Sequence, residues 1–444
     1  MKRFACVLFL LLSVTFLGFS NGTKEPVTPK DNSSLPYKGV DLTVAVCAEQ
    51  YADYLNQLAK SFNEKTGANV KVDVIGYVEL YQKITQDYAS GTKLYDLATV
   101  DIMWSGEFAQ KGYTMDLTDL IAKDKTEINT DDIIPVMWKI GSWDGKQIAY
   151  PMAGYANSLI YRKDLIEDPT EQKNFKAKYG YDLTVPTTLT QLKDIAQFFT
   201  RPDQNLYGLV ANGARGSAVA QDWMEYMRAF GGSLFDKDGK VSINSKEAKA
   251  SLEFFVSIFD KYAPPGAIGY WWDDRETSYR IGQSAMESSW SIARAGYEDP
   301  EISKVVGKTG MTALPKIETK DSLYGVGGWG IGINNDIDAQ KKDASWAFIK
   351  YITSQAEQKE WMMHDGAPIR YSTLNDPELL KAKPWLPEML NVFVNGDGDY
   401  RPRGPQATEI QNMLGLRVNQ AITHELTVDE ALKAAEKDLI AIMQ

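Results

Sequence analysis

The residues best suited to chemistry in this sequence stand directly after three apolar segments that we interpret as β-strands. They are Glu49 and Gln50 after residues 42–47, Tyr77 after residues 70–75, and Asp101 and Trp104 after residues 94–100. Loops at the carboxyl ends of parallel strands form the usual ligand site of an open α/β sheet. Carboxylates and amides hydrogen-bond to hydroxyl groups and aromatic rings cover apolar C–H faces, so this set would suit a sugar. Pairing of the two carboxylates with helix N-termini is the structural alternative.

Aromatic, amide and arginine side chains further along the chain extend the set of candidate ligand contacts. These further candidates are Tyr155, Asn157, Trp223, Trp271, Trp290, Trp329 and Arg401. Trp329 lies among glycines, so its immediate neighbours cannot pack its ring. Trp271 and Trp272 are adjacent and point in different directions, so we expect one at most in the site and the other in the core. A guanidinium fork at Arg401 could hold a pair of hydroxyls or a carboxylate. Core burial is the alternative for the tryptophans, and a solvated loop is the alternative for the arginine.

Motifs for catalysis or cofactor binding are weak in this chain. Gly325-x-Gly327-x-x-Gly330 fits a dinucleotide fingerprint in form, but it leads into a strand rather than a helix. The two histidines, His364 and His424, stand far apart, so we expect no His/Cys metal site and no cofactor. A glycoside hydrolase needs two carboxylates about 5–10 Å apart. The 59 acidic residues do not exclude such a pair, so a secreted carbohydrate-active enzyme stays an alternative.

The elements that must hold these side chains alternate between strands and helices. Apolar spacing predicts helices over residues 54–65 and 80–89, between the three strands. Gly67 is suited to the left-handed residue that ends a helix. This order is typical of a doubly wound parallel sheet. Thr427, with Glu430 three residues later, predicts a capped final helix.

The N-terminus predicts export. Lys2 and Arg3 precede an apolar run over residues 4–19, which indicates a signal peptide over residues 1–20. Residues 21–37 are rich in Pro, Ser and Thr and predict a flexible tether. We therefore expect an exported protein in a periplasmic or extracellular location. An uncleaved leader is the alternative, and membrane association stays open.

Length and charge narrow the class of protein. A chain of 444 residues is too long for one core and indicates two domains. The net charge of −11 becomes −13 once the leader is removed with its two basic residues, which argues against a nucleic-acid partner. Cys47 then stands alone and forms no internal disulfide.

Several segments, in their order and spacing, resemble the family 1 extracellular solute-binding proteins, and maltose-binding members in particular. The matching segments are Phe62-Asn63-Glu64-Lys65-Thr66-Gly67, Leu94-Tyr95-Asp96-Leu97, Ala149-Tyr150-Pro151-Met152-Ala153, Gly282-Gln283-Ser284-Ala285-Met286 with Trp290, Gly327-Gly328-Trp329-Gly330-Ile331, and Gly366-Ala367-Pro368-Ile369-Arg370. By this resemblance, Trp290 matches a position that stacks on ligand. Tyr155 matches a position that holds a carboxylate in maltose binders, and this departure puts maltose in doubt.

The resemblance implies an α/β fold of the two-lobed, periplasmic-binding-protein-like type II, with discontinuous lobes and a hinge. We predict an N-terminal lobe of residues 38–150 plus 330–367 and a C-terminal lobe of residues 151–329 plus 368–444. The implied function is a monomeric, non-enzymatic receptor. It would bind a mono- or oligosaccharide and deliver it to the permease subunits of an ABC transporter. A receptor for another solute, such as a polyamine, an anion or iron, is the remaining alternative, and the many tryptophans favour sugar.

Overall fold

The computed structural model describes residues 35–49, 51–317 and 324–444 of the chain. Its strands are β1 (Asp41–Cys47), β2 (Asn69–Ile75), β3 (Leu97–Asp101), β4 (Ser142–Trp143), β5 (Lys146–Gln147), β6 (Tyr150–Arg162), β7 (Met286–Trp290), β8 (Thr309–Ala313), β9 (Tyr324–Ile333) and β10 (Gly396–Asp397). Its α-helices are α1 (Ala52–Thr66), α2 (Tyr77–Ser90), α3 (Ser105–Lys111), α4 (Thr118–Lys123), α5 (Lys125–Ile128), α6 (Lys163–Ile166), α7 (Pro169–Tyr179), α8 (Leu189–Phe199), α9 (Ser217–Ala229), α10 (Lys246–Ser257), α11 (Trp272–Arg280), α12 (Arg294–Glu298), α13 (Ala339–Ile352), α14 (Gln355–Met363), α15 (Tyr371–Leu374), α16 (Pro377–Ala382), α17 (Leu386–Val394), α18 (Ala407–Ile422) and α19 (Val428–Ile442). The predicted signal peptide, residues 21–34 of the predicted tether, and Gln50 lie outside the described residues.

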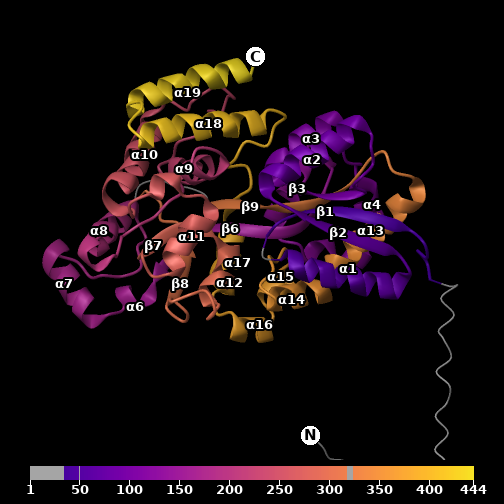
Figure 1. The fold of residues 1–444 in the computed structure, drawn as a ribbon, viewed down its shortest axis with the longest axis horizontal. Helices are drawn as coiled ribbons and strands as arrows, with labels where there is room; N and C mark the ends of the chain where they lie inside the picture. The colour runs from indigo at the N-terminus through magenta and orange to yellow at the C-terminus, as the bar shows by residue number, and fades with distance from the viewer. Residues whose placement is uncertain (1–34, 50, 318–323) are drawn as a thin grey trace, which may run out of the picture.

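The N-terminal elements form the parallel sheet that the sequence predicts (Figure 1). β1 lies between β2 and β3 and pairs with both in parallel. α1 ends at Gly67, whose φ of 79° is a left-handed conformation that glycine adopts without steric cost. Tyr37, the last residue of the predicted tether, stacks on Phe62 of α1 with ring centroids 6.3 Å apart. Because the strands are parallel, the carboxyl ends of β1, β2 and β3 meet at one edge of the sheet.

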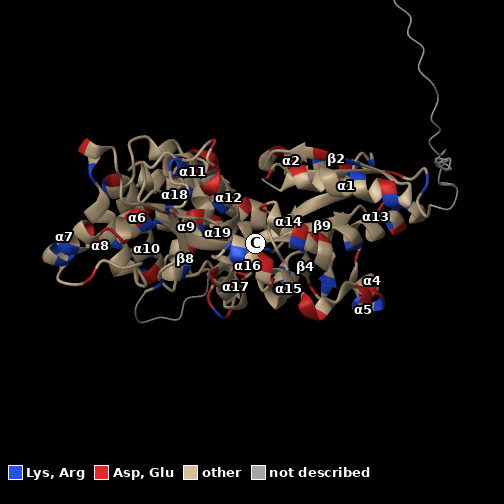
Figure 2. Ribbon diagram, turned by 90° about the horizontal axis from the view of Figure 1, so that it is seen from below, with Lys and Arg blue, Asp and Glu red and all other residues tan. Residues whose placement is uncertain are grey.

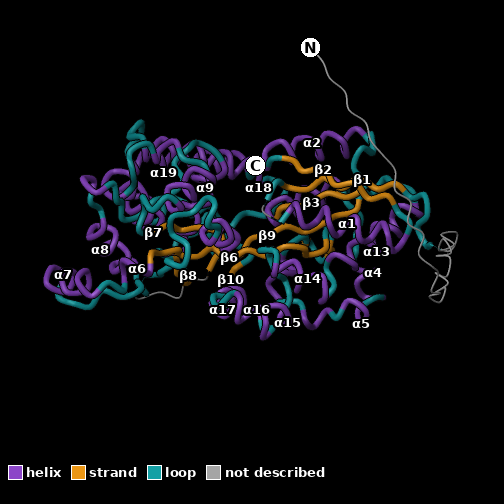
Figure 3. The backbone as a smooth tube through the Cα atoms, turned by 60° about the horizontal axis from the view of Figure 1, so that its bottom comes forward, coloured by secondary structure: helices purple, strands orange, loops and turns teal. Residues whose placement is uncertain are grey.

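Two long strands, β6 and β9, connect the two halves of the molecule (Figure 3). The first half contains the sheet β2-β1-β3, and the second half contains β7, β8 and the helices α8 to α11. The main sheet has the order β2-β1-β3-β9-β6-β7, with β8 also paired to β6 and β10 to β9. The first part of β6, Tyr150 to Ala156, pairs with β9 in antiparallel fashion. The second part, Asn157 to Arg162, pairs with β7 and β8. One continuous strand therefore belongs to the sheet of both halves, as expected for a segment that crosses between lobes.

Buried apolar side chains form two clusters: the first fills the first half and continues into the second half at Tyr279, Tyr297 and Met311, and the second lies within the second half. The first cluster includes side chains of β1, β3, β9, α1 and α13, and the second includes side chains of α8, α9, α10, α18 and α19. Ile369, Leu374 and Phe393, in the segment that we assigned to the C-terminal lobe, pack in this first cluster. In the structure the chain passes toward the second cluster between β10 and α18. The exact lobe boundaries remain predictions.

The surface carries charges of both signs. Basic and acidic residues are interspersed over both halves, as the blue and red segments of Figure 2 show. The excess of acidic residues gives the chain a net charge of −11. Among the described residues, no helix combines the length and the apolar composition that crossing a bilayer requires.

Candidate functional site

A cavity of about 540 Å³ lies between the two halves, at the carboxyl ends of β1 and β3. It is lined by Cys47, Ala48, Glu49, Ala52, Asp53, Val74, Gly76, Tyr77, Asp101, Tyr155, Gln221, Trp271, Trp272, Asp273, Glu276, Trp290, Ile292, Gly328, Trp329 and Arg401. Eight residues that the sequence singled out are in this lining, namely Glu49, Tyr77, Asp101, Tyr155, Trp271, Trp290, Trp329 and Arg401. The fold therefore brings together side chains that are far apart in the sequence, with 352 positions between Glu49 and Arg401.

The strand-end edge of the cavity holds a hydrogen-bonded tyrosine and aspartate. The Tyr77 hydroxyl donates to Asp101 Oδ2 at 3.1 Å. The other carboxylate oxygen of Asp101 accepts the Met103 N–H at 3.0 Å, which caps the short 3₁₀ helix Ile102–Trp104. Asp101 therefore caps a helix, as the structural alternative expected, and also lies in the cavity. Burial and the negative charge of Asp101 keep the pKa of Tyr77 well above its ordinary value, so the phenol stays a donor.

Arg401 supplies the positive charge of the cavity. Among the described lining residues it is the one basic side chain. Its Nη2 lies 3.6 Å from Asp101 Oδ1, and its guanidinium carbon lies 5.3 Å from the centre of the Trp290 ring. The side chain is only 4 % exposed, and no described residue accepts a hydrogen bond from its Nε. An unpaired buried donor is costly, so a ligand oxygen that accepts from this group would be stabilised.

Aromatic rings from both halves face the cavity. Tyr77 meets Trp329 with centroids 5.9 Å apart, and it meets Trp272 of α11 with centroids 5.7 Å apart. Trp271 and Trp272 are in edge-to-face contact at 4.8 Å, and both rings line the cavity. The expectation that one of this pair would be in the core was therefore wrong. Trp271 is the extended N-cap of α11 and Trp272 its first residue, so the helix start presents both rings to the same space.

Two glutamates in the cavity have raised pKa values. Burial, and then the negative charge of Glu276, raise the pKa of Glu49 to about 8, against a lowering contribution from a hydrogen bond with Trp329. Burial raises the pKa of Glu276 to about 7, although the neighbouring Arg275 guanidinium lowers it. These two carboxyl groups therefore change between their protonated and ionised forms near neutral pH. Each can accept a hydrogen bond when ionised and donate one when protonated.

Three predicted contacts are described by the structure but do not line the cavity. Trp104 is 2 % exposed and lies behind Tyr77 and Trp329, with centroids 5.5 Å and 5.4 Å from theirs. Asn157 is buried and its Oδ1 accepts from the Ser288 hydroxyl at 2.9 Å.

Trp223 lies in the second cluster of buried apolar side chains, away from the cavity. Its Nε1 donates to the Ser251 hydroxyl at 3.1 Å. The reason is that α9 packs against both α10 and α18, which bury most of its surface. The fourth predicted contact outside the lining, Gln50, lies outside the described residues.

The sequence analysis missed several polar lining residues, namely Asp53, Gln221, Asp273 and Glu276. Two of these residues, Asp53 and Asp273, carried a signal in the sequence that could have identified them. Asp53 follows Glu49 by four residues in the first turn of α1, and Asp273 follows the tryptophan pair directly. Gln221 carried no signal, because a glutamine in a predicted helix is ordinary. In the described part of the chain, no group of three or more His, Cys, Asp or Glu residues is arranged to hold a metal ion.

The chain matches the family model of the bacterial extracellular solute-binding proteins over residues 48–359. It therefore belongs to this family, which confirms the family predicted from the sequence and makes the protein a binding protein rather than an enzyme.

The solved structure of an ABC transporter solute-binding protein from Agrobacterium radiobacter K84, in complex with ribitol, is 42 % identical. That comparison covers 92 % of this chain and 100 % of the other, with a TM-score of 0.85, and it confirms the two-lobed fold. A mannitol-binding protein of Pseudomonas aeruginosa is 26 % identical, over 89 % of this chain and 91 % of its own length. A probable amino-acid ABC transporter periplasmic-binding protein of Sinorhizobium fredii is 24 % identical, over 90 % of this chain and 89 % of its own length.

Proposed function

We propose that this protein is an extracytoplasmic receptor for a small polyhydroxylated solute, a polyol or a monosaccharide, which it delivers to an ABC importer. The observation that carries the proposal is the cavity between the halves, in which Asp101, Tyr77 and Arg401 form a connected polar set beside aromatic rings. Carboxylates and a guanidinium bind hydroxyl groups, and rings cover the C–H surface between them. The ribitol complex of the Agrobacterium protein and the name of the Pseudomonas protein support a polyol.

The balance of charges in the cavity supports the same class of ligand. Five described lining residues carry carboxyl groups, namely Glu49, Asp53, Asp101, Asp273 and Glu276. An open-chain polyol offers a hydroxyl donor at every oxygen, whereas the ring and acetal oxygens of an oligosaccharide can only accept. An acceptor-rich cavity therefore favours the polyol. An amino acid would bring a carboxylate whose one basic partner among the described lining residues, Arg401, already lies beside Asp101.

The mechanism we propose is capture by closure of the two halves. Tyr77 belongs to the half that contains the parallel sheet, and Trp272 belongs to the other half, so a ligand in the cavity that both rings line would contact both halves. A ligand that binds the closed form better shifts the population toward it by that difference in affinity. The permease subunits would then recognise the closed receptor at the membrane. We propose a periplasmic or extracellular location and a monomeric state for the receptor itself.

The test is a ligand panel of ribitol, mannitol, glucose, maltose and the common amino acids, measured by thermal shift and calorimetry. We expect a polyol to raise the melting temperature, because a ligand present at about 100 times its Kd adds about 2.7 kcal/mol of stability. Arg401→Ala should lose this shift. Arg417→Ala, which removes an ion pair with Asp438 away from the cavity, is the matched control. A shift with amino acids and none with polyols or sugars would overturn the proposal.

Closure has its own measurement. Small-angle scattering with and without the ligand that the panel identifies should give a smaller radius of gyration in the bound state. An unchanged radius at saturating ligand, with an open ligand-free form established, would contradict the hinge mechanism.

A further inference from the structure

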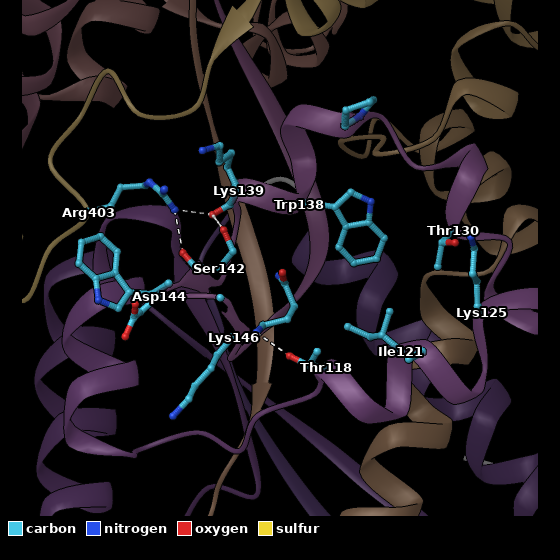
Figure 4. A pocket seen from close by; sticks show the side chains of 15 residues that line it. Thr118, Ile121, Lys125, Thr130, Trp138, Lys139, Ser142, Asp144, Lys146 and Arg403 are labelled. Atoms are coloured by element: carbon cyan, nitrogen blue, oxygen red, sulfur yellow. Dashed lines mark hydrogen bonds between the residues drawn. The ribbon is translucent and has the colours of Figure 1, made fainter. Parts of the chain in front are cut away.

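A short segment, residues 396–406, connects the two halves of the molecule, and we call it the strap. It begins at β10, which pairs with β9, and it ends where α18 enters the second cluster of buried apolar side chains. Arg401 of the strap lines the ligand cavity, whereas Arg403, two residues later, borders a surface groove of about 890 Å³ beside α4, α5 and the β4–β5 hairpin (Figure 4). The strap therefore carries one arginine toward the cavity and another toward the outside of the first half.

Arg403 fastens the strap to the first half through several contacts. Its Nη1 donates to the backbone carbonyl oxygens of Lys139 and Ser142, at 2.8 Å and 2.9 Å, as the dashed lines in Figure 4 show. Its Nε donates to Asp399 within the strap at 2.7 Å, and Asp399 also pairs with the Lys139 ammonium at 2.7 Å. The Arg403 side chain is 9 % exposed. Hydrogen bonds from a charged donor are among the stronger contacts in proteins.

The backbone of the strap is held at the same point. The Gly106 N–H, in α3, donates to the Arg403 carbonyl oxygen at 2.9 Å. A Cβ at Gly106 would lie 2.4 Å from that oxygen, so only glycine permits this approach. The anchored point is therefore specific in position, and it lies two residues from Arg401.

Arg401 has few contacts of its own that could hold it in place. Its ion pair with Asp101 is long, at 3.6 Å, and its Nε has no acceptor among the described residues. Its stacking on Trp290, at 5.3 Å, is not directional enough to fix the backbone. The position of this guanidinium in the cavity therefore depends on where the strap is held.

From these contacts we propose that Arg403 is a positioning residue for ligand recognition: by clamping the strap to residues 139–142, it sets the Arg401 guanidinium beside Asp101 and over Trp290. The inference rests on the proposed function, because it assigns Arg401 to the ligand. A lysine at position 403 could not serve, since a single ammonium cannot span Asp399 and both carbonyls in the manner of a planar guanidinium.

The first test is a double-mutant cycle with ribitol as the probe, using Arg401→Ala, Arg403→Ala and the double variant. We expect each single variant to weaken ribitol binding at least about tenfold. The double variant should be no more than about threefold weaker than Arg401→Ala alone, because removal of Arg403 acts through Arg401. Arg403→Lys should lose affinity like Arg403→Ala, and Arg417→Ala should bind normally. Additive losses, or normal affinity in Arg403→Ala with only a lower melting temperature, would show a purely structural role and overturn the proposal.

The second test needs no ligand and so separates this inference from the proposed function. Phenylglyoxal modifies accessible guanidinium groups, and Arg401 is 4 % exposed. Mass spectrometry of the modified, ligand-free protein should find Arg401 labelled faster in Arg403→Ala than in the wild type and in Arg417→Ala, which should be labelled at the same rate as each other. Equal labelling rates of Arg401 in folded Arg403→Ala and in the wild type would overturn the positioning role, even if ribitol proved not to be the ligand. Failure of the wild type to bind any polyol or sugar, with labelling as expected, would overturn the proposed function alone.

Discussion

The raised pKa values of Glu49 and Glu276 predict that the ligand-free protein loses stability as the pH rises toward 8. Both glutamates have an ordinary value of 4.5, which the folded protein raises to about 8 and about 7. At pH values between 4.5 and these raised pKa values, each glutamate keeps its proton in the folded protein but has already released it in the unfolded chain. Unfolding then releases protons, so the free energy of unfolding falls with increasing pH. Below about pH 4.5 both states are protonated and the effect disappears.

The size of the effect follows from the width of this window. Each pH unit within it costs up to about 1.4 kcal/mol for each group. Partial exposure of both side chains to the cavity reduces this figure, so we expect the two groups together to cost about 2 kcal/mol between about pH 5 and about pH 8. Glu49→Gln removes one of the groups that release a proton on unfolding. Burial raises the pKa values of Glu225 and Glu287 to about 8 as well, so these groups contribute to the same slope, and the variant should lose only part of it.

Urea unfolding at a series of pH values measures this slope directly. Glu64→Gln is the matched control, because Glu64 is an exposed residue of α1 outside the cavity. We expect the control to follow the wild type and Glu49→Gln to depend less on pH. A Glu49→Gln protein whose unfolding free energy falls as steeply as that of the wild type would refute the argument from burial and charge.

Four other substitutions test the separation of site from core. Trp290→Ala should weaken ligand binding at least about tenfold with little change in melting temperature. Trp223→Ala should instead cost about 3–5 kcal/mol of stability. Calorimetry and denaturation compare the two variants, and the reverse pattern would contradict the assignment of site and core. Gly327→Ala would put a Cβ 2.6 Å from Arg401 Nη2, so it should weaken binding in a titration, and normal affinity would mean that this arginine moves freely. Arg275→Ala should cost about 3–5 kcal/mol in urea unfolding, because this 1 %-exposed guanidinium pairs with two buried carboxylates; an unchanged midpoint would contradict it.

Local patterns in the sequence were sufficient to predict the secondary structure around the site. Apolar runs and helical spacing located β1, α1, β2, α2 and β3 in the right order. Gly67 ends α1 and the Thr427–Glu430 capping box begins α19, both as predicted. These features depend on a few adjacent residues and on backbone sterics, so they can be recognised without knowledge of the fold. The strand-end positions of Glu49, Tyr77 and Asp101 followed from the same reasoning.

Only the tertiary structure decided which tryptophans and which arginine face the cavity. Trp223 and Trp271 are both candidate ligand contacts in the sequence, but α10 and α18 cover Trp223 while the start of α11 exposes Trp271. Arg401 and Arg403 differ by two positions in one loop, and contacts with residues about 260 to 300 positions earlier direct them to opposite sides of the strap. The direction of a side chain depends on neighbours that the fold supplies from distant parts of the chain. Composition and spacing therefore determine the kind of ligand chemistry, and long-range packing determines which residues carry it out.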